Sequence, residues 1–126
     1  MSLFVELNDI TYKIIQRCIE VHKNLGPGLL ESVYEAALCI EMDLFGMKYE
    51  RQKVLPVFYK DKLIGKFFID ILVENHVVLE LKSVEKHNPI YETQVLNYLK
   101  LGNYKLGLLI NFNSYLLRYG IKRIIL

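Results

Sequence analysis

One stretch of the sequence restricts the fold more than any other, because it is almost continuously apolar and yet carries two charges. Residues Val77 to Val84 read VVLELKSV, in which only Glu80, Lys82 and Ser83 are polar. A short run of this kind is typical of a β-strand that is covered on both faces, since a strand with one solvent-exposed face alternates apolar and polar residues. Charged side chains inside such a strand are costly unless something matches them. The stretch therefore predicts a sheet covered by helices, with charges on one strand that need a partner.

Three segments have the pattern of helices. Apolar residues recur at three- and four-residue intervals from Leu7 to Leu25, with Asn8 or Asp9 as the expected cap and Gly26-Pro27-Gly28 as the end of the helix. A second amphipathic helix is expected from Leu30 to Phe45, followed by Gly46. Asn88-Pro89 supplies a cap and a first-turn proline for a third helix, which ends at Gly102.

The rest of the pattern predicts strands. Turn signals at 60–62 and 74–76 divide the β-branched and aromatic residues between Met47 and Val84 into three antiparallel strands. Further strands are expected at Leu106 to Asn111 and, at a sheet edge, at Ile121 to Leu126. The order ααβββαββ describes an α/β fold, an α+β mixed sheet flanked by helices. The length of 126 residues fits a single domain, residues 1–126.

Two acidic residues are expected to meet on the central hairpin. If its turn is centred on Asn75, Asp70 lies directly opposite Glu80 on the neighbouring strand. Two carboxylates about 5 Å apart repel by roughly 3 kcal/mol at an effective dielectric near 20, and a divalent cation would compensate this repulsion. Glu80 and Lys82 are two residues apart and share a face, and oxygen ligands of this kind suit Mg²⁺ or Mn²⁺. The alternative is a solvent-exposed strand face on which Lys82 forms a surface ion pair with Asp70.

The motifs along nearly the whole chain resemble those of the GxxExxY family of PD-(D/E)XK nuclease-like proteins. The naming motif corresponds to Gly28-Leu29-Leu30-Glu31-Ser32-Val33-Tyr34, and the nuclease signature to Asp70 followed by Glu80-Leu81-Lys82. A third motif corresponds to Gln94-Val95-Leu96-Asn97-Tyr98, and the segment 106–112 is also similar. Ile69 stands where the superfamily name has a proline that takes no part in the chemistry.

The resemblance implies a restriction-endonuclease-like core and a Mg²⁺-dependent nuclease acting on nucleic acid. Asp70, Glu80 and the carbonyl of Leu81 would bind Mg²⁺ or Mn²⁺, and Lys82 would orient or activate the attacking water. Glu31 could add a catalytic or metal-binding carboxylate from the second helix, and Gln94 and Tyr98 would border the substrate. The competing interpretation is a catalytically inactive scaffold that binds nucleic acid or a protein, because a fold does not by itself imply an activity.

The accessory residues have structural alternatives. Glu31 in a first helical turn can serve the helix dipole, and Tyr34 on the apolar stripe is expected in the core. Gln94 and Tyr98 can equally be helix-packing residues. The three histidines lack ligand spacing and are expected at the surface, with only the last close enough to the third helix to approach a substrate phosphate: His22, His76 and His87.

Composition adds several expectations. The net charge of +2 is too small to identify a nucleic-acid partner by itself. No apolar run approaches the ~20 residues of a membrane span, and residues 1–9 lack the features of a leader peptide, so a cytoplasmic protein is expected. Cys18 and Cys39 lie on apolar stripes and are expected to be buried, reduced thiols. The apolar edge strand 120–126 predicts a homodimer, unless Lys122 and Arg123 protect that edge.

Overall fold

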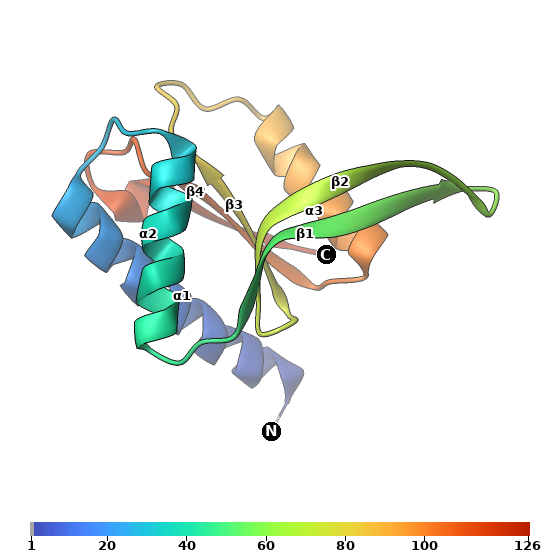
Figure 1. Ribbon diagram of the computed structural model, residues 1–126, viewed down its shortest axis with the longest axis horizontal. Coiled ribbons are helices and arrows are strands. Elements are labelled where there is room, and N and C mark those ends of the chain that lie inside the picture. Colours follow the sequence, from blue (N-terminus) through green and yellow to red (C-terminus); the bar gives the residue numbers. More distant parts are fainter. Residues whose placement is uncertain (1) are drawn as a thin grey trace.

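The elements follow one another in the expected order in the computed structural model, which describes residues 2–126 (Figure 1). They are α1 (Leu3–Leu25), α2 (Glu31–Leu44), β1 (Tyr49–Tyr59), β2 (Lys62–Val73), β3 (Val77–Lys82), α3 (Ile90–Gly102), β4 (Leu106–Asn111), the short 3-10 helix η1 (Leu117–Gly120) and β5 (Ile121–Ile125). Within the described residues, no helix is long and apolar enough to cross a membrane.

The strands form one mixed sheet in the order β1-β2-β3-β4-β5. Neighbouring strands run antiparallel except β3 and β4, which are parallel and are connected through α3. The crossover helix is what a parallel pair requires, because a tight turn cannot return the chain to the start of the next strand. The predicted α+β mixed sheet flanked by helices, with the last strand at an edge, is confirmed.

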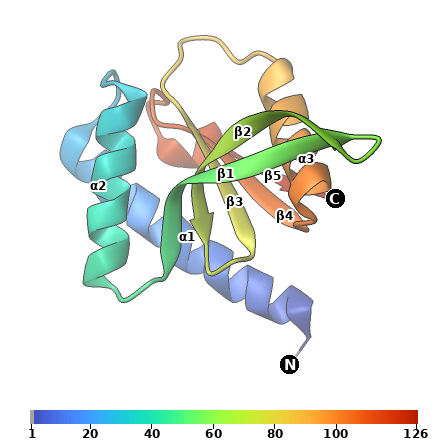
Figure 2. The same cartoon turned by 45° about the vertical axis from the view of Figure 1, so that its right-hand side comes forward.

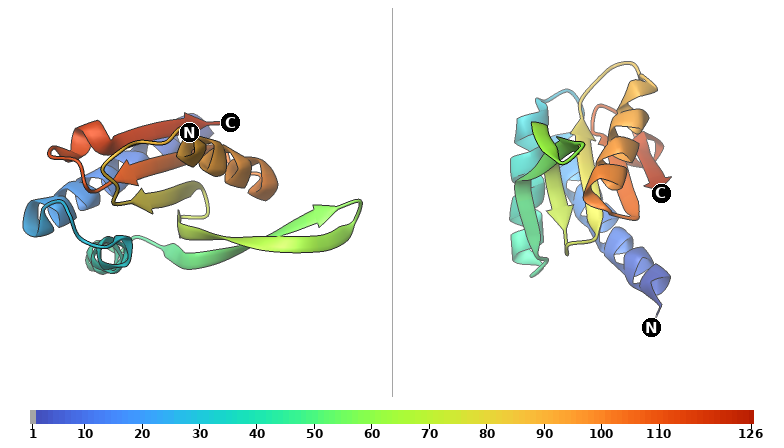
Figure 3. Two further views of the ribbon diagram at one scale, coloured as in Figure 1. Left: turned by 90° about the horizontal axis from the view of Figure 1, so that it is seen from above. Right: turned by 90° about the vertical axis from the view of Figure 1, so that its right-hand side faces the viewer.

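Helices cover both faces of the central strands, which gives the molecule two apolar layers. One layer lies under α1 and α2 and includes Leu79, Leu81 and Ile110 from the sheet. The other lies under α3 and includes Val78 and Leu109. Figure 3, in its right-hand view, shows α2 and α3 on opposite sides of β3. The expectation that β3 is covered on both faces is confirmed, since its first five residues are buried.

A glycine on β4 sets how closely α3 approaches the sheet. A Cβ atom added to Gly107 would lie 2.6 Å from Cγ1 of Val95 on α3 and 3.3 Å from the carbonyl oxygen of Val78. Any side chain at this position would therefore push the helix away, so the absence of a Cβ allows the close contact between α3 and the sheet.

The start of α1 differs from the prediction. The helix begins at Leu3, and Ser2 caps it by accepting a hydrogen bond from the backbone N–H of Val5. Asn8 and Asp9 lie inside the helix, where the Asn8 side chain accepts a hydrogen bond from Arg123 of β5. The expectation of a cap at Asn8 or Asp9 was wrong because Leu3 and Phe4, which are exposed, extend the helix outside the apolar stripe. A capping serine is enough to start the helix at this point, so its first turn does not need buried residues.

The tip of the β1–β2 hairpin extends beyond the rest of the molecule, as Figures 1 and 2 show. Its two-residue turn consists of Lys60 and Asp61, with φ values of 47° and 65°, the left-handed geometry typical of tight hairpins. At the other end of β2, Ile71, Leu72 and Val73 pair with β3, whereas the residues before Asp70 pair with β1 alone. We call residues 53–68 the hairpin arm.

Candidate metal centre

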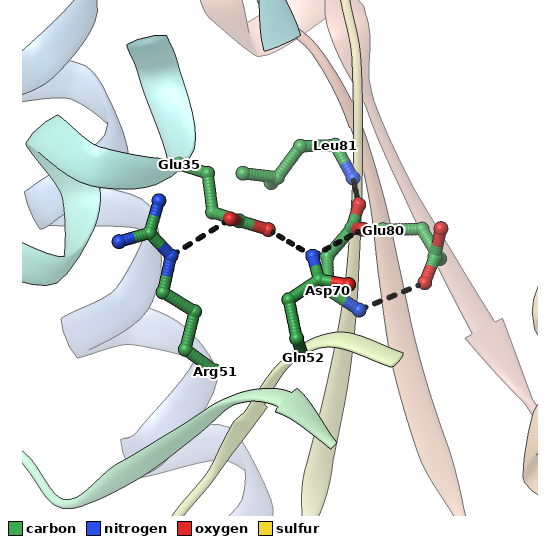
Figure 4. A network of polar contacts seen from close by, with 6 residues as sticks. All are labelled: Glu35, Arg51, Gln52, Asp70, Glu80 and Leu81. Atoms are coloured by element: carbon green, nitrogen blue, oxygen red, sulfur yellow. Dashed lines mark hydrogen bonds and ion pairs between the residues drawn. The ribbon is translucent and has the colours of Figure 1, made fainter. Parts of the chain in front are cut away.

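The candidate centre lies at the point where β2 separates from β3. The pairs Ile71–Leu79, Leu72–Val78 and Val73–Val77 have the predicted register, and the ladder ends after Ile71. Beyond that point the side chains of Asp70 and Glu80 replace backbone pairing (Figure 4). The backbone N–H of Leu81 donates to Oδ2 of Asp70 at 2.9 Å, and the N–H of Asp70 donates to Oε1 of Glu80 at 3.2 Å. The two carboxylates therefore meet at the edge of a gap in the sheet.

Burial makes this pair electrostatically unfavourable when both groups are charged. Glu80 is only 7% exposed. Burial, together with the charge of Asp70, raises the pKa of Glu80 to about 8, and burial is also the main cause of the raised pKa of Asp70. Desolvation and a like charge both disfavour the ionised form. The site therefore holds a proton or a cation at neutral pH.

The alternative of a solvent-exposed strand face is wrong. Glu80 is buried, and Lys82 forms no ion pair with Asp70 or with any other residue in the described part of the chain. The ammonium group of Lys82 lies over the ring of Tyr91 on α3, 4.7 Å from its centroid. A cation over an aromatic face keeps its charge and its capacity to donate hydrogen bonds. Lys82 is thus close to the carboxylates but not neutralised by them.

A second buried carboxylate, which the sequence patterns did not identify, belongs to Glu35 on α2. Its side chain is 10% exposed and accepts hydrogen bonds from Nε of Arg51 and from Nε2 of Gln52, both at 2.8 Å. The same amide nitrogen of Gln52 lies 3.4 Å from Oδ1 of Asp70. Gln52 thus connects the helix carboxylate to the pair, as Figure 4 shows.

The backbone of Gln52 is strained in a way that serves this connection. Its φ is 53°, and the ladder between β1 and β2 passes from the Arg51–Ile71 pair to the Lys53–Ile69 pair without including it. Left-handed geometry is unusual for glutamine, which lacks the short side chain that makes it tolerable for asparagine, and such strain clusters at functional sites. The sequence signal that could have identified Glu35 is its position four residues before Cys39, which puts both residues on the same face of the helix. That face is buried.

Glu31 and Tyr34 take different positions. Glu31 is exposed in the first turn of α2, and the carboxylate that connects to Asp70 comes from the next turn. Tyr34 is fully buried, as expected for a core residue, and stacks on Phe112 with 4.5 Å between ring centroids. Its hydroxyl donates to the carbonyl of Gly26 and accepts from the N–H of Leu29. Tyr34 therefore fixes the loop between α1 and α2.

The two candidate residues of α3 differ in their surroundings. Tyr98 is half-buried, and burial together with the charges of Glu80 and Asp70 raises its pKa. Its ring contacts Phe67 of the hairpin arm at 5.6 Å between centroids. Gln94, one turn earlier, is exposed.

A small pocket lies next to Lys82 and contains the histidine that was expected near the third helix. Lys82, His87, Tyr91 and Lys122 are among its lining residues. Glu92 accepts from Nε2 of His87 at 2.7 Å and from Nζ of Lys122 at 2.8 Å, and these contacts lower its pKa. Of the other histidines, His76 is exposed, and His22 is bonded to the carbonyl of Ser114.

The donors present determine which metal the centre could hold. Residues 2–126 contain no cluster of three His, Cys, Asp or Glu side chains suited to a metal ion. Two carboxylates, a backbone carbonyl and waters are nevertheless an ordinary set for Mg²⁺, which retains several waters. The N–H of Leu81 points toward Asp70, and in an extended strand the carbonyl of a residue points to the same side as its N–H. The residues therefore fit a partly hydrated Mg²⁺ or Mn²⁺ ion.

One protein family matches most of the chain. A family model described as the PD-(D/E)XK nuclease superfamily matches residues 8–124, which include every residue of the candidate centre. No curated protein and no solved structure gives a significant match.

Proposed function

Because the chain belongs to the PD-(D/E)XK nuclease superfamily, we propose that it is a Mg²⁺- or Mn²⁺-dependent nuclease that hydrolyses phosphodiester bonds of nucleic acid. The observation that carries the proposal is the Asp70–Glu80 pair, in which Glu80 is buried and Asp70 half-buried. Each carboxylate bonds to the backbone of the other's strand, and no described cation forms an ion pair with either. Asp70, Glu80 and the carbonyl of Leu81 are the proposed ligands. A bound divalent ion would lower the pKa of a coordinated water and stabilise charge on the phosphate.

Lys82 is the proposed catalytic partner of the pair. Its ammonium group is held over Tyr91 and is free of ion pairs within residues 2–126, so its hydrogen bonds remain available to a phosphate oxygen or to the attacking water. His87 and Lys122 line the same pocket and are proposed to contact the substrate backbone. Gln94 and Tyr98 are proposed to border the substrate from α3.

The helix α2 offers two further carboxylates with different proposed roles. Glu35, through Gln52, is proposed as a positioning residue that orients Asp70. Glu31 remains a candidate metal or catalytic residue at the exposed start of the helix. The substitutions Glu35→Gln and Glu31→Gln separate these roles. Loss of Glu35 should weaken Mn²⁺ binding because Asp70 loses its orientation, whereas loss of Glu31 should change cleavage only if that carboxylate contacts the metal or the substrate.

Cleavage of labelled single-stranded DNA, duplex DNA and RNA with Mg²⁺, Mn²⁺ or EDTA tests the proposal. Glu80→Ala should abolish both Mn²⁺ binding and cleavage, whereas Lys82→Ala should abolish cleavage and leave Mn²⁺ binding nearly intact, because the lysine is not a ligand. Lys105→Ala, which removes an exposed lysine far from the pair in sequence, is the matched control. Metal-dependent cleavage that survives both substitutions would contradict the assignment.

A catalytically inactive scaffold that binds nucleic acid or a protein is the second candidate. The observation in its favour is that, among the described residues, the centre lacks a third ligating side chain. This candidate predicts no Mn²⁺ binding in the millimolar range and no cleavage of any substrate, with binding of a polymer still measurable.

Three narrower proposals accompany the function. We place the chain in the GxxExxY group, supported by Gly28 with a φ of 95°, which favours glycine, and by the fixed position of Tyr34. A cytoplasmic location is supported by Cys18 and Cys39, which are both buried and unpaired. A homodimer through the edge strand β5 is supported by the apolar surface beside it, formed by Leu3, Phe4, Ile125 and Leu126.

A further inference from the structure

The hairpin arm has features that the proposed chemistry does not use. We propose that residues 53–68 form a binding surface for single-stranded nucleic acid that leads the strand to the Asp70–Glu80 pair. The inference rests on the proposed nuclease function, because it names the class of substrate for the same site.

The arm carries aromatic side chains that remain largely exposed in the described chain. Four of its rings are more than two-fifths exposed: Phe58 at 60%, Tyr59 at 62%, Phe67 at 45% and Phe68 at 44%. Isolated exposed apolar residues are ordinary, but several on one protruding hairpin indicate an interaction surface. Unpaired bases stack on aromatic rings of this kind regardless of sequence.

The charge of the arm identifies a polyanion as the partner. Residues 53–68 contain four lysines and one aspartate, a net charge of +3, whereas the whole chain carries +2. Lys60, Lys62 and Lys66 form no ion pair with any residue in the range 2–126. Nζ of Lys60 lies 5.5 Å from the Tyr59 ring centroid, and Nζ of Lys66 lies 5.6 Å from that of Phe68. Each of these neighbouring pairs could bind one base and one phosphate.

The arm is continuous with the candidate centre. Side chains alternate along a strand, so Lys66 and Phe68 of the arm lie on the same face of β2 as Asp70. The stretch of β2 from Lys62 to Asp70 spans about 26 Å at the rise of a β-strand. This length is enough for several nucleotides of an extended single strand, and single-strand sites cover about 4–16 nucleotides.

A single strand fits this surface better than a duplex or a second copy of the chain. The bases of a duplex stack on one another, so they offer no free faces to the rings along the arm. At the tip, Leu63 and Ile64 are both 65% exposed, and aliphatic residues of this kind can wedge between bases where a strand opens. Two arms placed against each other would bring together surfaces of the same positive charge, which opposes self-association.

Binding measured without metal tests the arm independently of cleavage. The full chain is titrated in EDTA into labelled oligothymidylate, oligouridylate and duplex DNA, each about 20 nucleotides long, and anisotropy is followed at several salt concentrations. The charge variant is Lys60→Ala/Lys62→Ala/Lys66→Ala. Its matched control removes three exposed lysines elsewhere: Lys23→Ala/Lys100→Ala/Lys105→Ala.

We expect the single strands to bind more tightly than the duplex. The charge variant should bind at least about tenfold more weakly at low salt, and its salt slope should fall by about 2, since each lost single-strand phosphate contact contributes about 0.7. The variant Phe58→Ala/Phe68→Ala should bind at least about fivefold more weakly, the lower end of the value of base stacking. The control should bind as the unmodified chain does.

The inference is overturned by an absence of binding to any single strand, by equal binding of the charge variant and its control, or by sedimentation that shows the arm occupied by a second copy. If the arm variants cleave DNA as well as the unmodified chain does, the proposed role of the arm is refuted, but the proposed nuclease function is not. Binding that depends on the arm, in a chain that never cleaves, refutes the proposed nuclease function alone.

Discussion

Replacing Glu80 with glutamine should stabilise the metal-free protein, although it removes a central residue of the candidate centre. The native pKa of Glu80 is about 8, raised by burial and by Asp70, against an ordinary value of 4.5. A carboxyl group whose pKa is raised on folding favours the folded state only while it is protonated. Its unfavourable contribution therefore begins near pH 4.5 and grows until the pH exceeds about 8. The substitution to glutamine removes this cost and keeps the shape of the side chain.

The size of the effect follows from the pKa difference. Raising the pKa from 4.5 to about 8 costs on the order of 5 kcal/mol once Glu80 is fully ionised, and roughly 3 kcal/mol at pH 7. The side-chain carbonyl of the introduced glutamine can still accept from the N–H of Asp70, and its amide N–H can donate to the Asp70 carboxylate, so no buried hydrogen bond is lost. We expect Glu80→Gln to raise the free energy of unfolding at pH 7 by roughly 3 kcal/mol, which raises Tm by about 10 °C.

Urea denaturation in EDTA, followed by circular dichroism between pH 4.5 and pH 9, measures this difference. The difference in the free energy of unfolding between Glu80→Gln and the unmodified chain should be absent near pH 4.5 and should increase with pH. Glu50→Gln is the control, because the Glu50 side chain is 48% exposed and its ion pair with Lys53 is a surface pair. Exposed pairs contribute less than about 1 kcal/mol, so the control should change little at any pH.

Divalent metal provides the second half of the test. Millimolar Mg²⁺ or Mn²⁺ should stabilise the unmodified chain, by about 2.7 kcal/mol at a hundredfold excess over Kd, and should leave Glu80→Gln unchanged. A variant that is less stable than the unmodified chain at pH 8, or a stability difference that does not depend on pH, would refute the electrostatic reasoning.

Three further predictions concern the scaffold. Tyr34→Phe should lower the free energy of unfolding by about 1–3 kcal/mol in urea titrations, because the hydroxyl satisfies the Gly26 carbonyl and the Leu29 N–H, whereas Tyr12→Phe at an exposed position should change nothing. Gly107→Ala should cost about 1–3 kcal/mol in the same assay, because its Cβ would lie 2.6 Å from Val95, and Val95→Ala in the same chain should restore part of the loss. Cys18, whose thiol pKa is raised by complete burial, should not react with a thiol reagent at pH 8 until the chain is unfolded.

The parts of the site that local patterns determine were predictable from the sequence. The meeting of Asp70 and Glu80 follows from a single tight turn, because the register of a hairpin is fixed by its turn and every later pair follows from it. The coverage of β3 follows in the same way from its nearly unbroken apolar run.

The contribution of Glu35 could not be predicted from a local pattern. Its contact with Asp70 passes through Gln52, whose left-handed backbone turns the amide toward both carboxylates. Neither propensity nor periodicity predicts positive φ at a glutamine inside a strand. The naming motif therefore indicated Glu31, its acidic residue, although the buried carboxylate lies one helical turn later.

The separation of β2 from β3 is the feature that links the candidate centre to the hairpin arm. Asp70 occupies the position where the ladder would continue, and its carboxylate, not its strand's carbonyl, accepts the N–H of Leu81. The preceding residues of β2 are then free of β3 and pair with β1 alone, which lets the hairpin leave the sheet. A half-buried acidic residue in this position thus ends the ladder and directs the arm outward from the same point. This common origin is why we expect a strand bound along the arm to reach the carboxylate pair.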